Sequence, residues 1–270
     1  MTKKVGLALG SGSAKGIAHI GVIQALEENG IPIDMVSGSS AGAIIGSIYA
    51  AGTDLSMLGK FFASISSRDY MDMTLPRTGR GGLIKGERMQ ELVRLFTHDK
   101  TFDQTRIPFL CMAVDAETGE LLTFQDGKKK LHECVRASMS IPGVFVPIRI
   151  DGRLCVDGGV LERVPCIPLR DKGADVIIGV DVGYRGEVRR IKVPTVRSIV
   201  DNTLDIMQWE ITRLRLDAAD IMLCPQVRTL MKGFSTEHTE ECIAEGRRVA
   251  EEALPRILEV LEKKGILLKR

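Results

Sequence analysis

The chain has 270 residues, of which 44% are hydrophobic but only 4% aromatic, and its formal net charge is +2. A chain of this length can bury a substantial core, and this composition makes the core aliphatic. The near-neutral charge argues against nucleic acid as the main partner. Six cysteines, none in a C-x-x-C pair, lie mostly in apolar runs, which favours buried free thiols over a metal site.

Short apolar runs, typical of buried strands, alternate along the chain with helical patterns. Strands are expected at residues 5–9, 35–37, 109–114, 121–124, 154–156, 176–182 and 221–223. Helices are expected at 17–28, at 196–214 and at 249–261, the last with a kink at Pro255. This alternation predicts the α/β class, as a three-layer α/β/α arrangement with a central, mostly parallel sheet.

A glycine-rich loop, Gly10-Ser11-Gly12-Ser13-Ala14-Lys15-Gly16, joins the first strand to the first helix. A dinucleotide-binding fingerprint would need glycine at position 15, and a P-loop would need serine or threonine after Lys15. Both nucleotide templates therefore fail on spacing. The loop can still offer backbone N–H groups to an oxyanion, and a simple strand-to-helix turn is the alternative. Lys15 itself suits either an anion contact or a structural ion pair.

The second strand ends in Gly38-Ser39-Ser40-Ala41-Gly42, a G-x-S-x-G sequence followed at once by an apolar helix pattern. Strand, tight turn and helix form the context of a nucleophile elbow, in which the flanking glycines permit a strained turn that exposes Ser40. A helix that starts at the serine directs its free N–H groups and its dipole at negative charge formed there. In a parallel sheet this turn and the first loop emerge at the same edge.

An activated serine needs a base, and Asp157-Gly158-Gly159 follows another short apolar strand. Alone this sequence is an ordinary turn signal. A histidine base is the alternative, but in the order of an α/β-hydrolase triad only His238 lies late enough in the chain. The sequence around the other three favours packing or surface roles: His19, His98 and His132. A serine–aspartate dyad is therefore the better hypothesis.

Four segments in order resemble bacterial patatin-like phospholipases: 10–16, 38–42, 137–147 (Ala-Ser-Met-Ser-Ile-Pro-Gly-Val-Phe-Val-Pro) and 157–159. The resemblance covers about residues 5–225 and implies a single patatin-like catalytic domain over 1–270. Ser11 and Ser13 stand where the family often has glycine. Serine is tolerable at these two positions provided that neither adopts a positive φ.

The resemblance implies that Ser40 is the nucleophile and Asp157 the general base of a lipid acyl hydrolase that works through an acyl-enzyme. Its substrates would be those of a phospholipase A, a lysophospholipase or a carboxylesterase, with no cofactor and no metal. The implied oxyanion and substrate contacts are Gly10, Ser11, Gly12, Ser13 and Ala41, with Gly12 and Ser13 favoured as donors. The alternatives are an acyltransferase that uses the same acyl-enzyme and a non-catalytic regulatory protein on the same fold.

Two further segments are weighed as sites of contact with lipid. Residues 55–83 are rich in Met and Phe and end in Arg77-Thr78-Gly79-Arg80-Gly81-Gly82, which suits a mobile lid lining an acyl-chain pocket. An ordinary amphipathic helix with a loop is the alternative. The basic run 185–192 is better explained as a solvated loop than as a site for anionic lipid heads. Without a signal-peptide pattern or a long apolar run, we expect a cytoplasmic protein with at most peripheral membrane contact.

Overall fold

The computed structural model describes residues 3–72, 81–125, 127–188, 191, 193–231 and 233–268. Within these residues, eight strands form one sheet: β1 (Val5–Leu9), β2 (Met35–Ser39), β3 (Phe109–Asp115), β4 (Leu121–Phe124), β5 (Ile148–Ile150), β6 (Arg153–Asp157), β7 (Val176–Val180) and β8 (Ile221–Leu223). Their order is β5-β6-β3-β2-β1-β7-β8, and β4 pairs separately with β3.

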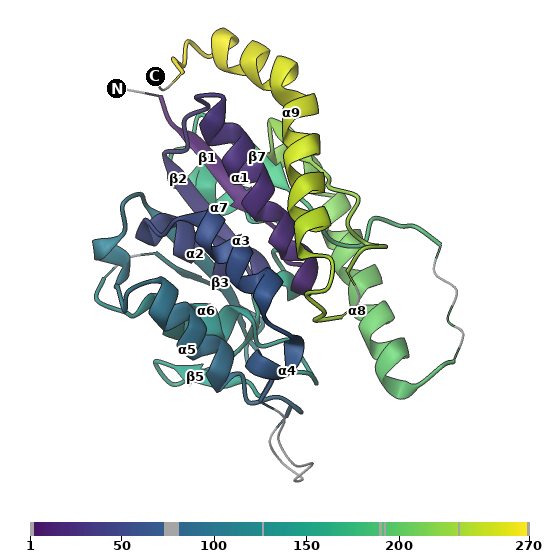
Figure 1. The fold of residues 1–270 in the computed structure, drawn as a ribbon. Coiled ribbons are helices and arrows are strands. Elements are labelled where there is room, and N and C mark those ends of the chain that lie inside the picture. The colour runs from purple at the N-terminus through teal and green to yellow at the C-terminus, as the bar shows by residue number, and fades with distance from the viewer. Residues whose placement is uncertain are drawn as a thin grey trace.

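Helices lie on both sides of this sheet (Figure 1). The α-helices are α1 (Ala18–Glu28), α2 (Ala41–Ala51), α3 (Leu55–Ser64), α4 (Ser67–Tyr70), α5 (Glu87–Phe96), α6 (Leu131–Ser138), α7 (Cys166–Asp171), α8 (Val196–Arg213) and α9 (Thr239–Lys263). Short 3-10 turns are η1 (Ser13–Ile17), η2 (Phe102–Gln104), η3 (Gly158–Val160) and η4 (Leu216–Ala218). The predicted α/β/α arrangement is confirmed.

The sheet has a parallel part and an antiparallel part. Strands β3, β2, β1, β7 and β8 run parallel to their neighbours, whereas β4 and β6 are antiparallel to β3, and β5 is antiparallel to β6. All seven predicted strands are present. Strand β5 was not predicted, because its three residues form a partly exposed edge strand without a continuous apolar run.

Alternating side chains of β1 serve the two faces of the sheet. Val5, Leu7 and Leu9 join the larger core, which α1, α2 and α9 cover. Ala8 points to the opposite face and packs with Leu169 of α7. Each face of the strand is therefore buried under a helical layer, as a mainly parallel sheet requires.

The longest helix, α9, packs closely along α1. A Cβ at Gly246 would lie 2.0 Å from the backbone oxygen of Ala18, so only glycine lets the two helices approach this far. The helix continues through Pro255, and Figure 1 shows it bending in this half, where the missing N–H of proline interrupts the hydrogen-bond pattern.

All six cysteines lie in the described residues and are free, and five of them are buried, which confirms the expectation of buried thiols. Burial raises the pKa of Cys134 to about 12 and that of Cys242 to about 12, so these thiols stay protonated. Among the described residues, no helix combines the length and the apolar character needed to cross a membrane.

Candidate active site

Strand β3 pairs with both β2, which ends next to Ser40, and β6, which ends at Asp157. Its residue Met112 pairs with Ser39 at the end of β2, and the next residue, Ala113, pairs with Asp157 at the end of β6. Both partners lie on the same edge of β3, because β4 occupies the opposite edge at both positions. The sheet register therefore holds Ser40 and Asp157 next to each other, although 117 residues separate them in sequence.

Ser40 forms a strained elbow between β2 and α2. Its φ is 53° and its ψ is −116°, a conformation that side chains rarely adopt and that costs ~1–3 kcal/mol. The strain falls on the serine itself rather than on the flanking glycines. Gly42 is required for a different reason, since a Cβ there would lie 2.0 Å from the backbone oxygen of Leu9. The backbone N–H of Ser40 donates to Ser138 Oγ at 2.9 Å.

Asp157 lies buried beside this elbow. Its Oδ1 accepts a hydrogen bond from the N–H of Gly159 at 2.7 Å, and its carboxylate lies next to the Ser40 side chain in the polar hollow. Burial raises the pKa of Asp157 to about 6, against the lowering effects of the Ser40 side chain and the Gly159 N–H. The carboxylate is thus a stronger base than an exposed aspartate and is still ionised at neutral pH.

The glycine-rich loop lies next to the elbow, and its first two N–H groups are already in use. Gly10 N–H donates to the oxygen of Val180, and Ser11 N–H donates to the oxygen of Arg163, both at 2.9 Å. These bonds hold the loop in place but remove the N–H groups of Gly10 and Ser11 as oxyanion donors. Within the described residues, no protein acceptor takes the N–H groups of Gly12, Ser13 or Ala41.

The backbone at Ser13 corrects one expectation from the sequence. Ser11 avoids the left-handed region, but Ser13 has a φ of 54°. A positive φ at Ser13 turns the loop into η1, so this serine carries strain that glycine would not. Two strained serines, Ser13 and Ser40, therefore face the same site.

The histidines have other roles than that of a base for Ser40. His19 Nε2–H donates to the oxygen of Gly10 at 2.8 Å, and burial lowers the pKa of His19 to about 4, which keeps the ring neutral. His238 precedes α9 and contacts Glu241 on the surface. No histidine lines the two hollows that contain Ser40, in the part of the chain that the structure describes. The arrangement thus offers no histidine for a triad.

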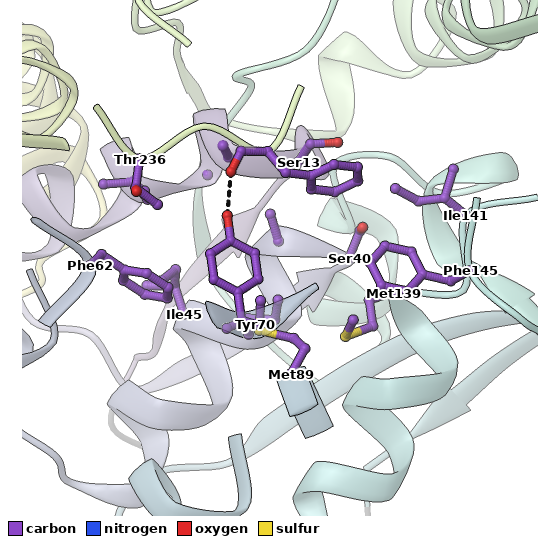
Figure 2. A pocket seen from close by; sticks show the side chains of 16 residues that line it. Ser13, Ser40, Ile45, Phe62, Tyr70, Met89, Met139, Ile141, Phe145 and Thr236 are labelled. Atoms are coloured by element: carbon purple, nitrogen blue, oxygen red, sulfur yellow. Dashed lines mark hydrogen bonds between the residues drawn. The ribbon is translucent and has the colours of Figure 1, made fainter. Parts of the chain in front are cut away.

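One of these hollows is apolar (Figure 2). Most of the side chains that line it are apolar, as is usual in ligand pockets. Figure 2 shows the Ser40 hydroxyl at its wall, with the rings of Phe62, Tyr70 and Phe145 around it. The phenol of Tyr70 donates to the backbone oxygen of Phe234, so this polar group is satisfied within the wall. Such a lining suits a hydrocarbon chain.

The other hollow is polar and contains both Ser40 and Asp157. Charged and amide side chains from several elements line it: Lys15, Asp201, Asp205, Gln208 and Arg228. Ser13, Ser40, Ile141 and Phe234 belong to both hollows, so Ser40 lies where an apolar space and a polar space meet.

The structure brings together residues whose supporting roles the sequence did not reveal. Ser138 accepts the Ser40 N–H, and the buried Arg136 donates to Ser140 Oγ at 2.8 Å and to the oxygen of Val146 at 2.6 Å. Both lie at the start of segment 137–147 or just before it, so the motif marked the region but not the partners. Such pairings depend on tertiary contacts.

A buried ion pair supports the loop from the other side. The Arg163 guanidinium contacts Asp181 Oδ2 at 2.6 Å, and both side chains are almost fully buried. The backbone oxygen of the same arginine receives the Ser11 N–H. Breaking a buried pair of this kind leaves an uncompensated charge, so we expect Arg163 to hold the loop rigidly.

Other predicted segments are described in part. Residues 73–80 lie outside the described residues, and the lid function of 55–83 stays a prediction. Its helices nevertheless supply Phe62 and Tyr70 to the apolar hollow, whereas Phe61 packs against Phe96. In the basic run, residues 189, 190 and 192 lie outside the described part, and Arg185 N–H donates to Glu187.

The fold and this constellation are those of a known family. The family model for patatin-like phospholipase matches residues 7–170, which is more than half of the chain. The chain therefore belongs to the patatin-like phospholipase family.

Relatives in bacteria and fungi share this region. An uncharacterized NTE family protein of Mycobacterium tuberculosis is 39% identical over 179 residues, which cover 66% of this chain and 49% of that protein. Lysophospholipase NTE1 of Saccharomyces cerevisiae is 35% identical over 191 residues, covering 66% of this chain and 11% of that one. The chain thus spans about half of the mycobacterial protein and a small part of the fungal enzyme. A bacterial origin stays a prediction.

Solved structures agree on the fold. VipD from Legionella pneumophila aligns with a TM-score of 0.63 and 16% identity, over 94% of this chain and 67% of that one. The type III effector protein ExoU aligns with a TM-score of 0.52 and 14% identity, over 95% and 53%. At these identities the likeness concerns the fold alone.

Proposed function

We propose that this protein is a serine acyl hydrolase that cleaves lipid esters through an acyl-enzyme on Ser40. The observation that carries the proposal is the placement of the strained Ser40 beside the buried Asp157, whose pKa is raised to about 6. A serine hydroxyl becomes an effective nucleophile only with a base within hydrogen-bond reach. Two fungal relatives are named lysophospholipases, which favours the same chemistry.

In the first half-reaction Ser40 Oγ attacks the ester carbonyl carbon while its proton passes to the Asp157 carboxylate. The carbonyl oxygen becomes an oxyanion, which the N–H groups of Gly12, Ser13 and Ala41 stabilise, together with the N-terminal end of α2. When the tetrahedral intermediate collapses, the carbon–oxygen bond to the leaving alcohol breaks. Asp157 gives its proton to that alcohol, and the acyl group stays on Ser40.

In the second half-reaction a water molecule attacks the acyl carbonyl and gives a proton to Asp157. The same N–H groups hold the new oxyanion. Collapse releases the fatty acid, and the proton returns from Asp157 to Ser40 Oγ. No metal or cofactor takes part in these steps.

The two hollows orient the substrate in this scheme. The acyl chain lies in the apolar hollow, since its lining of Phe62, Tyr70 and Phe145 matches a hydrocarbon. The leaving alcohol with its polar head group, and later the water, occupy the polar hollow beside Asp157. A substrate with one acyl chain fits this division, because the described residues form one apolar hollow at Ser40.

Turnover of p-nitrophenyl esters and of lysophosphatidylcholine by wild type, Ser40→Ala and Ser39→Ala tests the proposal. Ser39 is the matched control, because it is buried next to Ser40 and its hydroxyl has no hydrogen-bond partner among the described residues. We expect Ser40→Ala to lose activity and Ser39→Ala to keep it. A folded Ser40→Ala with wild-type turnover would reject the mechanism.

A further inference from the structure

Exposed apolar side chains are concentrated in one short part of this chain. Sixteen large hydrophobic side chains are exposed in the described residues, and eight of them lie within 188–207. The others are scattered over four helices, a loop, the residue that follows α8 and the C-terminal end. Single exposed apolar side chains need no explanation, but a contiguous group usually marks an interaction site.

The group forms a stripe along α8. Val196, Ile199, Val200, Ile206 and Met207 repeat at helical spacing, and each is at least 45% exposed. We call these five residues the α8 stripe. Val193, just before the helix, is 69% exposed and extends it. In Figure 1 the first turns of α8 project from the side of the molecule, away from the sheet.

The opposite side of α8 belongs to the candidate active site. Leu204, Asp205 and Gln208 line the polar hollow that contains Ser40. Trp209 lies under the Arg163 guanidinium, whose carbon is 5.5 Å from the ring centroid. The polar hollow and the α8 stripe thus lie on opposite sides of α8, and an α-helix with its side chains is only ~10 Å in diameter. Whatever covers the stripe is therefore brought next to the mouth of the hollow.

The chemistry of the stripe favours a lipid surface over a protein. Hot spots of protein interfaces are rich in Trp, Tyr and Arg, whereas the α8 stripe consists of four β-branched aliphatic residues and one methionine. The sequence around its start, residues 184–197, has five basic residues and one acidic residue. The acidic residues Asp201 and Asp205 of α8 line the polar hollow on the other side of the helix. The basic run, which by itself is better explained as a solvated loop, therefore precedes an apolar helix face in the sequence, a pattern typical of helices that lie in the interface of anionic membranes.

We propose that the α8 stripe docks this protein on an anionic lipid bilayer. Docking places the polar hollow within one helix diameter of the lipid head groups, so that a lipid can reach Ser40 directly from the bilayer. This consequence for catalysis rests on the proposed function, whereas the docking itself does not.

Vesicle flotation tests the docking, with Ser40→Ala as the background so that no lipid is consumed. The probe is phosphatidylcholine vesicles with and without phosphatidylglycerol. The stripe variant is Ile199→Asp with Met207→Asp, whose wild-type side chains are 45% and 56% exposed. The matched control is Met57→Asp with Leu95→Asp on α3 and α5, at 50% and 54%.

We expect the stripe variant to lose about tenfold or more in affinity for anionic vesicles, because two apolar contacts are replaced by charges that a bilayer excludes. The control should bind like its parent, and phosphatidylglycerol should strengthen binding in a salt-dependent way. Equal binding by the stripe variant and the control would overturn the proposal. So would a stripe variant that only converts a dimer into monomers, which would make a second copy the occupant.

A second readout uses the same substitutions with Ser40 intact. The stripe variant should hydrolyse vesicle lipid at least several-fold more slowly than the control, while turnover of soluble p-nitrophenyl butyrate stays equal. If the wild type cleaves no ester at all, the proposed function fails, and the flotation result still decides the docking. If the stripe variant cleaves vesicle lipid as fast as the control, the α8 stripe does not deliver substrate.

Discussion

Two hollows meet at Ser40, and they differ in the polar groups of their walls. In the apolar hollow the one phenol of the wall, that of Tyr70, is bonded to the backbone of Phe234. In the polar hollow a buried carboxylate, Asp157, keeps a raised pKa beside the serine. Under the proposed function, one side binds the acyl chain without reacting and the other moves protons, and Ser40 lines both. The following predictions test this division.

The largest effect is expected from removing the base on the polar side. Asp157→Asn keeps the shape and the hydrogen bond from Gly159, but an amide cannot accept the serine proton. We expect kcat for a short soluble ester to fall by about 10²–10⁴-fold. A kcat within threefold of wild type would show that another group is the base.

The stability of Asp157→Asn serves as the control for correct folding, and we expect it to differ from that of wild type in a defined direction. The pKa of Asp157 is raised on folding, so ionisation of the buried carboxylate costs stability between about pH 4 and pH 6 and fully above that range. At pH 8 the free energy of unfolding of Asp157→Asn should therefore exceed that of wild type by up to about 3 kcal/mol, and the variant should unfold at a higher temperature. The difference should vanish near pH 4.

The pH profile of the wild type follows from the same carboxylate. Only ionised Asp157 can act as the base, so kcat/KM should rise about tenfold per pH unit up to about pH 6 and then level off. A profile that levels off near pH 4 would indicate an exposed, unperturbed aspartate. Initial rates on a soluble ester from pH 4 to pH 9 measure this.

The loop that borders both hollows should be sensitive to His19. This histidine holds the oxygen of Gly10 and so fixes the direction of the N–H groups that follow. His19→Ala should lower kcat by about 10–100-fold with little change in KM, because donors displaced by ~1 Å lose the oxyanion. His19→Gln can donate to the same oxygen and should recover part of the loss. An unchanged kcat in a folded His19→Ala would remove His19 from the account.

The apolar side can be tested with two neighbouring phenylalanines. Phe62 lines the hollow, whereas Phe61 packs against Phe96 outside it. Phe62→Leu should lower kcat/KM for a decanoyl ester about threefold relative to a butyryl ester, and Phe61→Leu should not. Equal chain-length preferences in the two variants would mean that acyl chains bind elsewhere.

No effect is expected from removing metal ions. Among the described residues no cluster of three or more His, Cys, Asp or Glu side chains is placed to hold a metal. Activity should survive dialysis against a chelator. If activity were lost on dialysis and recovered with Ca²⁺, a cation would have to be placed in the polar hollow and the proposed mechanism would have to include it.

The sequence predicted the parts of the site that depend on local chain chemistry. Strand, turn and helix around Ser40 followed from apolar periodicity and two glycines, and the free thiols followed from their apolar surroundings. The prediction that Asp157 lies near Ser40 depended on the family resemblance. The local sequence does not show this proximity, because it arises from the pairing of both strands with adjacent residues of β3.

What the sequence missed are consequences of tertiary packing. The use of the Gly10 and Ser11 N–H groups and the role of Ser138 each depend on partners far away in sequence. The positive φ at Ser13 was also not predicted. The same holds for α8, whose periodicity predicted a helix correctly but could not show that its apolar face lies outside the core.

The central claim is that Ser40 is an activated nucleophile, and covalent labelling tests it most directly. The protein is treated with a fluorophosphonate probe, and the modified peptide is identified by mass spectrometry in wild type, Ser40→Ala and Ser39→Ala. We expect a single adduct on Ser40, absent from Ser40→Ala and unchanged in Ser39→Ala. A folded wild type without an adduct, or with the adduct on another residue, would contradict it.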